Sequence, residues 1–418
     1  MSASAMQQMG ERGREAMRLL QNSTGEQRQV AIAQIATDLR SEADAIIAAN
    51  EIDLAHAIST QLTDAMIDRL RLDHERVCAM ASALDDIAQL PDPVGTVLET
   101  RTRPNGLRIE RVSVPLGVIG IIYESRPNVT ADAAAICLKA GNSVILRGGS
   151  ESAQSSRAIV SLVREALAKA GLPQDAVQMV PTQDRAFVGE MLGGMNGCLD
   201  VLVPRGGRGL VERVQADARV PVIGHLEGLC HIYVDAAADV GMARDIVVNA
   251  KMRRTGICGA AETLLIDSGL PETASHTVLD ALVISGCELR GCDRARALHP
   301  SMLEATDSDW VCEYLDSVIA VKVVDGVEGA LAHIGAYGSG HTESIVTSDV
   351  AVAEHFLQAQ DSAIVMHNAS TQFADGGEFG MGAEIGISTS RIHARGPVGA
   401  NELTSYKYVV RGTGQLRA

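Results

Sequence analysis

The sequence is poor in aromatic residues, which make up 3% of its 418 positions and include a single tryptophan, Trp310. Proteins that bind single-stranded nucleic acid stack bases on aromatic side chains, and proteins that bind duplexes present a basic surface. Here 36 lysines and arginines stand against 52 aspartates and glutamates, for a formal net charge of -16. We therefore expect no nucleic-acid partner.

Long apolar runs are also missing. No stretch of about 18 apolar residues is present, so we expect no membrane span. The segment Met1–Leu20 contains Glu11 and Glu15 and is typical of an amphipathic helix rather than a signal peptide. The eight cysteines include no C-x-x-C pair, and their scatter through a long chain indicates reduced thiols. These features predict a cytoplasmic protein.

The length predicts two or three domains, and the order of patterns predicts their type. The first 90 residues favour helices, because apolar side chains such as Ile32, Ile35 and Leu39 recur at helical spacing. Asn105-Gly106 then separates two strand-like runs between residues 97 and 114, which predicts a β-hairpin. A hairpin placed ahead of the next domain often serves as an arm.

From residue 114 onward, short apolar runs alternate with segments of helix length. This rhythm predicts βαβ units and two α/β domains with mostly parallel sheets. The expected strands are 118–122, 144–146, 177–180, 201–203, 221–223, 263–266, 317–324, 344–346 and 363–366. The segment 373–399 is rich in glycine, and a final strand at 405–410 needs a partner. That partner is either the hairpin or a neighbouring subunit.

Cys258 is the most suggestive thiol. Lys251, Arg253 and Arg254 precede it, and glycines flank it closely. Basic neighbours favour the nucleophilic thiolate, and glycines let the backbone approach a ligand. The alternative interpretation is a structural cysteine beside a solvated basic turn.

A thiol nucleophile suggests two chemistries. In a cysteine hydrolase or acyltransferase, His225, His231 or His341 would act as the base. In an enzyme acting on an aldehyde or acyl phosphate, oxyanion donors beside the thiolate suffice. Glu227 follows a predicted strand and is a candidate for proton transfer. The spacing of His225 and His231 matches no common metal motif, so the sequence predicts no metal site.

Two loops could bind phosphate. Each follows a predicted strand, contains glycines and precedes a predicted helix, where free backbone N–H groups attract anions. One loop offers Arg205, Gly206 and Gly207, with Arg208 close behind, and the other begins at Arg147. Two such loops on one sheet fit a dinucleotide, although either alone could be an ordinary turn.

The chain resembles the γ-glutamyl phosphate reductases of the aldehyde dehydrogenase superfamily. The resemblance covers nearly the whole sequence, because several long motifs occur in order. The motifs are 114–120 (VPLGVIG), 123–130 (YESRPNVT), the loops at 146–151 and 201–207, the Cys258 segment, 340–347 (GHTESIVT), 379–388 (FGMGAEIGIS) and 393–397 (HARGP).

The resemblance implies an aldehyde dehydrogenase-like α/β fold with two Rossmann-like domains and a small β oligomerisation element. Residues 1–96 and 114–230 would form the NADP-binding domain, and 231–372 the catalytic domain. Residues 97–113 and 398–418 would form the oligomerisation element, and 373–397 would return to the cofactor domain. The activity implied is NADPH-dependent reduction of L-glutamyl 5-phosphate to L-glutamate 5-semialdehyde with phosphate release, the second step of proline biosynthesis from glutamate. A homo-oligomer and association with glutamate 5-kinase are further expectations.

The resemblance also implies roles for particular residues. Cys258 corresponds to the nucleophile that forms a thioester, and Glu227 to the general base of the hydrolytic enzymes. In the superfamily the oxyanion asparagine stands two residues before a proline, where this chain has Ser125. Asn128, directly after Pro127, is therefore the candidate oxyanion donor. The remaining candidates bind ligands. They are Arg147, Ser150, Glu151, Arg205, Gly206, Gly207 and Glu313 for the cofactor, and Arg126, Arg254 and His341 for the substrate.

Three other functions remain open. They are a hydrolytic aldehyde dehydrogenase with Glu227 as base, a thiol hydrolase, and an inert binding protein. For the reductase, we expect the basic residues of the loops to line a positive cleft in a negative protein.

Overall fold

The computed structural model describes residues 4–124, 126–181 and 184–417, and the chain forms two compact units. Unit 1 comprises Met1–Gly224, Gly380–Gly386 and Val398–Ala418, and unit 2 comprises His225–Phe379 and Ile387–Pro397. No helix in the described ranges is long and apolar enough to cross a membrane.

Unit 1 begins with helices, as the apolar spacing predicts. They are α1 (Ala5–Leu20), α2 (Gly25–Ser41), α3 (Ala43–Ser59), α4 (Asp64–Leu70) and α5 (His74–Gln89). Capping residues set several of their starts. Ser4 caps α1, Thr24 forms a capping box with Gln27 at α2, and Asp73 caps α5. The side chains that these helices bury include Ile32, Ile35 and Leu39 of α2.

A four-stranded parallel sheet forms the centre of unit 1. Its strand order is β5-β4-β3-β6. The strands are β3 (Val118–Tyr123), β4 (Ser143–Arg147), β5 (Val177–Met179) and β6 (Val201–Arg205), and the helices between and after them are α6 (Asn128–Lys139), α7 (Ala153–Lys169), α8 (Arg185–Leu192) and α9 (Arg208–Asp217). On one face, β3 side chains pack with Met9 of α1, Met191 of α8 and Val214 of α9. The predicted strand at 221–223 is wrong, because Val222 makes only an isolated bridge to Leu202.

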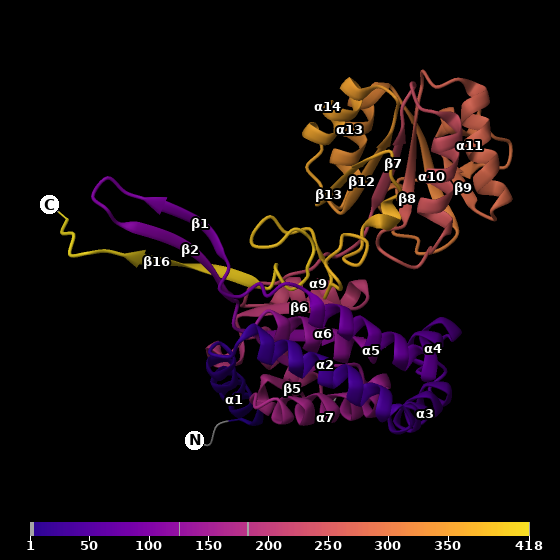
Figure 1. The fold of residues 1–418 in the computed structure, drawn as a ribbon. Helices are drawn as coiled ribbons and strands as arrows, with labels where there is room; N and C mark the ends of the chain where they lie inside the picture. Colours follow the sequence, from indigo (N-terminus) through magenta and orange to yellow (C-terminus); the bar gives the residue numbers. More distant parts are fainter. Residues whose placement is uncertain (1–3, 125, 182–183, 418) are drawn as a thin grey trace. The chain divides into compact units, whose positions relative to one another are not determined.

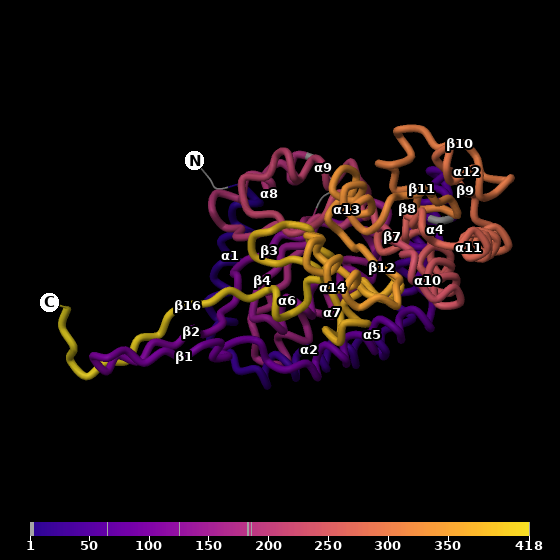
Figure 2. Tube along the Cα trace, turned by 90° about the horizontal axis from the view of Figure 1, so that it is seen from above, coloured from indigo at the N-terminus to yellow at the C-terminus, as the bar shows by residue number. Residues whose placement is uncertain are grey.

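A three-stranded antiparallel arm projects from the helices of unit 1 (Figures 1 and 2). It contains β1 (Val97–Thr102), β2 (Arg108–Pro115) and β16 (Thr404–Arg411). The predicted Asn105-Gly106 turn joins β1 to β2, and Gly106 has a φ of +87°, which glycine adopts readily. The final strand pairs with β2, so the hairpin is its partner within the chain.

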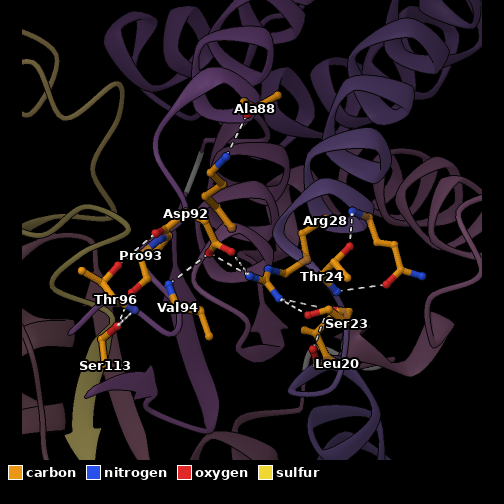
Figure 3. Close-up of polar contacts among 12 residues, drawn as sticks. Leu20, Ser23, Thr24, Arg28, Ala88, Asp92, Pro93, Val94, Thr96 and Ser113 are labelled. Carbon is orange, nitrogen blue, oxygen red and sulfur yellow. Dashed lines mark hydrogen bonds and ion pairs between the residues drawn. The ribbon is translucent and has the colours of Figure 1, made fainter. Parts of the chain in front are cut away.

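A buried arginine ties the N-terminal helices to the base of this arm (Figure 3). Arg28 of α2, 1% exposed, makes two hydrogen bonds to the carboxylate of Asp92, at 2.7 and 2.8 Å. The same carboxylate accepts a hydrogen bond from the N–H of Val94, and the other guanidinium nitrogen donates to Ser23. The hydroxyl of Ser113 in β2 continues the network, because it donates to the carbonyl of Pro93 and accepts a hydrogen bond from the N–H of Thr96. This network holds the segment between α5 and β1 in place.

Unit 2 is built on a seven-stranded parallel sheet with the order β10-β9-β11-β8-β7-β12-β13. The strands are β7 (Cys230–Val234), β8 (Ala261–Asp267), β9 (Glu288–Gly291), β10 (Leu303–Glu304), β11 (Val318–Val324), β12 (Thr342–Val346) and β13 (Ile364–His367). The helices are α10 (Val240–Met252), α11 (Glu272–Ile284), α12 (Asp293–Arg296), α13 (Gly326–Tyr337) and α14 (Val350–Ala359). A two-stranded ribbon pairs β14 (Ile387–Ser388) with β15 (Gly396–Pro397).

Helices cover both faces of this sheet (Figure 1). Ile232 and Val234 of β7 pack in a cluster with side chains of α10 and α11, such as Val247 and Leu279. Tyr233, on the other face of the strand, packs in a second cluster that contains residues of α13 and α14. Because successive strand residues point to opposite faces, a sheet buried on both sides gives a continuous apolar run. The two parallel α/β sheets predicted from the sequence are confirmed.

Two features differ from the expectations. The segment 373–397 does not return as a whole to unit 1, because only 380–386 belong to that unit and Ile387–Pro397 belong to unit 2. Glycines with positive φ at 380, 382, 386 and 396 bend the chain there. Five strands of the described chain were not predicted. Strand β7 carries His231 in its apolar run, and β9, β10, β14 and β15 have only two to four residues each.

Candidate active site

Cys258 lies on a tight loop between α10 and β8, where it is half-buried. Glycine makes this loop's position attainable, because a β-carbon on Gly228 would lie 2.6 Å from the β-carbon of Cys258. The following segment is also close, since a β-carbon on Gly259 would lie 3.1 Å from the carbonyl oxygen of Thr371. Gln372 donates from its side chain to the carbonyl of Ala250, at 2.8 Å, and so anchors the end of α10.

Two histidines stand beside the thiol. One ligand atom from each of His225, Cys258 and His341 lies within 4.8 Å of the others. The imidazole rings of His225 and His341 meet edge to face, with centroids 4.8 Å apart. His231, the third histidine considered as a base, points into the core instead, where its Nδ1 lies 2.9 Å from the Glu343 carboxylate. The interpretation of His231 as a base for Cys258 is therefore wrong.

A second cysteine, Cys230, forms a hydrogen bond to the loop that carries Cys258. Cys230, the first residue of β7, is buried, and its thiol donates to the carbonyl oxygen of Cys258 at 3.0 Å. Burial raises the pKa of Cys230 well above its ordinary value, so it remains a thiol. Cys230 is thus a structural neighbour of Cys258.

Glu313 positions the other side of the loop. Its carboxylate accepts a hydrogen bond from the N–H of Gly228 at 2.9 Å. Burial raises the pKa of Glu313, and this hydrogen bond opposes the rise. Glu227, the candidate base, is the neighbour of Gly228 and is half-buried. Glu313 therefore holds Gly228, the glycine that packs against Cys258, and the sequence did not predict this contact.

The three basic residues before Cys258 have separate surroundings. Lys251 is fully buried and lies 2.5 Å from the carboxylate of Glu262, also buried, so its charge is matched there. Burial raises the pKa of Glu262, and the lysine opposes the rise. Arg253 and Arg254 are exposed, and Arg253 contacts Gln372. The expectation that all three bases act on the thiol is wrong for Lys251.

The candidates of unit 2 share one edge of its sheet. Cys258, Cys230 and His341 lie at the start of β8, β7 and β12, which are neighbouring parallel strands. The starts of parallel strands meet at one edge, so residues far apart in the sequence come together there. This is the amino edge of the sheet, whereas ligands of open α/β sheets usually bind at the carboxyl edge.

The candidates of unit 1 lie at the carboxyl edge of its sheet. Arg147 ends β4 and leads into the loop with Ser150 and Glu151, and Arg205 ends β6 and leads into Gly206 and Gly207. The β4 loop approaches the sheet closely, since a β-carbon on Gly148 would lie 3.0 Å from the hydroxyl of Tyr123. This arrangement is typical of a dinucleotide site.

Carboxylates occupy parts of both loops. Glu124, which follows β3, accepts the N–H of Gly207 at 2.9 Å, at the N-terminus of α9 where an anion was expected. Arg205 lies 3.7 Å from the Glu384 carboxylate. The carboxylate of Glu151 folds back toward Ser150, whose hydroxyl donates to it at 3.3 Å. Sequence reasoning did not single out Glu124, although its place after the strand next to β6 could have indicated it.

Arg126 lies between β3 and α6, and Asn128 is the first residue of α6; both are half-buried. The side-chain amide of Asn128 donates to Asp132 at 2.9 Å. Burial raises the pKa of Asp132 to about 6, against the effects of Asn128 and Arg205. Ser125, which replaces the usual asparagine, lies outside the described residues. Asn128 belongs to unit 1 and Cys258 to unit 2.

Comparisons with known proteins identify the family. The aldehyde dehydrogenase family matches residues 1–283. The chain is 57% identical over 412 residues to a γ-glutamyl phosphate reductase of Parvibaculum lavamentivorans, covering 99% of this chain and 97% of that one. A γ-glutamyl phosphate reductase of Hyphomonas neptunium is 58% identical over 415 residues, with the same coverage.

Solved structures lead to the same conclusion. A crystal structure of γ-glutamyl phosphate reductase from Thermotoga maritima has a TM-score of 0.96 and 44% identity, covering 99% of this chain and 100% of that one. An acetylating aldehyde dehydrogenase from Geobacillus thermoglucosidasius, at 18% identity and a TM-score of 0.70 over 99% and 97% of the two chains, shares the fold. The chain therefore belongs to the γ-glutamyl phosphate reductases, within the aldehyde dehydrogenase family.

Proposed function

We propose that the protein reduces L-glutamyl 5-phosphate to L-glutamate 5-semialdehyde with NADPH and releases phosphate, in the second step of proline biosynthesis from glutamate. The observation that carries this proposal is Cys258, half-buried on a glycine-bounded loop in a chain 57% identical to a γ-glutamyl phosphate reductase over almost its full length.

The sulfur of Cys258 would act as the nucleophile. It attacks the carbonyl carbon of the acyl phosphate, the carbon–oxygen bond to phosphate breaks, and the thiol proton leaves with the phosphate. The product is a thioester on Cys258, which accepts hydride more readily than a carboxylate does. The reduced nicotinamide, when bound, supplies that hydride. The carbon–sulfur bond then breaks, which releases the aldehyde and leaves the thiolate of Cys258, and a proton from solvent restores the thiol.

The loops after β4 and β6 fit a dinucleotide. Gly148 lets the backbone run close beside Tyr123, and Arg147 and Arg205 bring positive charge to the carboxyl edge of the sheet. Arg147, Ser150, Glu151, Arg205, Gly206 and Gly207 are the residues we propose to hold the cofactor, together with Glu313 from unit 2. Glu124 would have to leave the N–H of Gly207 for an anion to bind there. The family uses a nicotinamide cofactor, and we propose NADPH over NADH.

The roles of the other candidates follow from the family. Asn128 is proposed as the donor to the developing oxyanion, and Arg126, Arg254 and His341 as contacts of the glutamyl moiety. Among the proposed substrate contacts, the role of His341 has the least direct support, because its side chain is fully buried beside Cys258.

A hydrolytic aldehyde dehydrogenase with Glu227 as general base is the second candidate. The position of Glu227, next to the glycine that packs against Cys258, favours it. A base that activated water would destroy the thioester before reduction, so the reductase assignment requires that Glu227 has another role.

The arm is the proposed oligomerisation element. Val97, Leu98, Tyr408 and Val410 are each about half-exposed on it, and its outer strands β1 and β16 have unpaired edges within the described chain. We propose a cytoplasmic homo-oligomer. Association with glutamate 5-kinase is a further proposal, since an acyl phosphate is short-lived in water.

The reverse reaction tests the function most directly. Purified protein with glutamate 5-semialdehyde and NADP should generate the absorbance of the reduced nicotinamide only when phosphate or arsenate is present. Cys258→Ala should abolish this activity, and Cys78→Ala, at an exposed cysteine on α5, should not. Equal activity of the wild type and Cys258→Ala would refute the mechanism, and oxidation without phosphate would favour the hydrolytic candidate.

A further inference from the structure

Three side chains at the amino edge of the unit 2 sheet form a set of metal donors, and no step of the proposed reaction requires the three to act together. They are the sulfur of Cys258 and the imidazoles of His225 and His341, whose donor atoms lie within 4.8 Å of one another. The segments that carry them lie far apart in the sequence, so spacing gave no sign of the group. One soft sulfur and two imidazole nitrogens are the ligands that Zn²⁺ prefers, and the set has no carboxylate oxygen to favour Mg²⁺ or Ca²⁺.

The hydrogen bonds of His341 prepare one nitrogen for a metal. This residue is fully buried, and its Nε2 has no hydrogen-bond partner among the described residues. Its Nδ1 lies 2.9 Å from the hydroxyl of Thr342 and 3.5 Å from the sulfur of Cys230. The thiol of Cys230 already donates to the carbonyl of Cys258, so Nδ1–H donating to Thr342 satisfies both groups. In that tautomer Nε2 carries the lone pair that binds a metal.

His225, whose ring contacts that of His341, has the same arrangement. Its Nδ1 lies 2.7 Å from the carbonyl oxygen of Ile387. A carbonyl only accepts hydrogen bonds, so Nδ1 must be the donor and the lone pair is on Nε2. A hydrogen bond from the second ring nitrogen to a backbone carbonyl is the usual support of a metal-binding histidine. Cys258 and His225 are half-buried, which leaves the site open to entry from solvent.

We propose that Cys258, His225 and His341 bind Zn²⁺, and that the bound ion masks the thiol reversibly. Zinc bonds of about 2.3 Å to sulfur and 2.0–2.1 Å to nitrogen place tetrahedral ligand atoms roughly 3.5 Å apart, so shifts on the order of 1 Å complete the site. The thiol loses its proton to solvent as the sulfur–zinc bond forms, and water fills the fourth position. Masking as a form of regulation rests on the proposed function, because it requires Cys258 to be the nucleophile. Metal binding itself does not.

Co²⁺ is a suitable probe, because it takes the same tetrahedral geometry and its bond to a thiolate absorbs in the near ultraviolet. We expect the full-length protein, without a histidine tag, to bind one Co²⁺ per chain with this thiolate band and with tetrahedral ligand-field bands. Zn²⁺ should displace the Co²⁺. Cys258→Ala should lose the thiolate band, whereas Cys78→Ala should keep it.

Histidine variants then identify the nitrogen ligands. His225→Gln and His341→Gln should each weaken Co²⁺ binding at least about tenfold, because each removes one ligand. His355→Gln, at a half-exposed histidine of α14, should bind as the wild type does. If buried His341→Gln fails to fold, half-buried His225→Gln carries the test. A thiolate band that survives in Cys258→Ala, or wild-type affinity in His225→Gln, would overturn the site.

The masking is measured separately. Zn²⁺ should slow the alkylation of Cys258 by iodoacetamide, which mass spectrometry measures. It should also inhibit the reductase until a chelator is added. Full activity at Zn²⁺ concentrations that saturate the site would refute the masking. A Cys258→Ala variant that kept its activity but lost the Co²⁺ band would refute the proposed nucleophile and leave the metal site standing. The opposite pattern, lost activity in Cys258→Ala and no band in the wild type, would refute the metal site alone.

Discussion

A β-carbon added to Gly228 would lie 2.6 Å from the β-carbon of Cys258 and 2.7 Å from its α-carbon. The chain that leads into β7 therefore packs against the thiol loop so closely that only glycine fits. The N–H of the same glycine donates to Glu313, so both the size and the hydrogen bond of this residue locate Cys258.

Gly228→Ala should displace the thiol loop, because the clash involves backbone atoms that cannot rotate away. We expect kcat/KM to fall roughly 100-fold, the typical effect of moving a reacting group by about 1 Å. Gly335→Ala is the matched control, since its β-carbon would meet nothing within 4 Å in α13. Steady-state kinetics and the alkylation rate of Cys258 measure the effect. Unchanged values in Gly228→Ala would show that the loop tolerates the extra carbon.

Glu227→Gln distinguishes the two candidate activities. If the protein is a reductase, the variant should keep phosphate-dependent activity within about tenfold of the wild type, because no water has to be activated. A general base typically contributes 10²- to 10⁴-fold, so a loss of that size would support the hydrolytic candidate. Glu272→Gln, at an exposed position of α11, serves as the control. Rates with and without phosphate are compared for all three proteins.

Asp92→Asn should destabilise unit 1, because it leaves the buried guanidinium of Arg28 without its countercharge. Breaking a buried ion pair costs about 3–5 kcal/mol, and we expect roughly 2–3 kcal/mol here since Asp92 is itself partly exposed. Asp85→Asn removes the partner of Arg40, in an exposed pair, and should change the free energy of unfolding by less than about 1 kcal/mol. Urea denaturation of both variants gives the comparison. Equal changes in the free energy of unfolding in the two variants would mean that the burial of Arg28 does not increase the cost of losing its partner.

Asp132 should make stability depend on pH. Its pKa is raised to about 6 in the folded protein from an ordinary value of 3.8, mainly by burial. Between these values the folded state binds more protons than the unfolded state, so the free energy of unfolding should fall as the pH rises from about 4 to 6.

Asp132→Asn removes this titration and resembles the protonated side chain. At pH 8 the variant should exceed the wild type in stability by up to about 3 kcal/mol, and the difference should vanish below pH 4. Asp293→Asn, at an exposed carboxylate of α12, should leave the pH profile unchanged. A constant difference between Asp132→Asn and the wild type across this range would contradict the assignment.

Local patterns in the sequence were sufficient for much of the fold. Most of the apolar runs became the parallel strands, and Asn105-Gly106 became part of the turn of the arm, because strand patterns and a short turn depend on neighbouring residues alone. The nucleophile candidate, Cys258, was also recognisable, from its glycines and from the family motif around it. The isolated bridge at Val222 and the unpredicted strand β7 are positions where local propensity is too weak to decide whether a strand forms.

Relationships between distant segments were decided only by the tertiary structure. Strand pairing brings the starts of β7, β8 and β12 to one edge, which places His225 and His341 beside Cys258 and sends His231 to Glu343. Burial pairs Lys251 with Glu262 rather than with the thiol, and β3 carries Glu124 to the N–H of Gly207. Each of these contacts depends on register and on desolvation, which arise when the sheets and helices pack. A single sequence therefore identified the candidate thiol, and only the fold determined its neighbours.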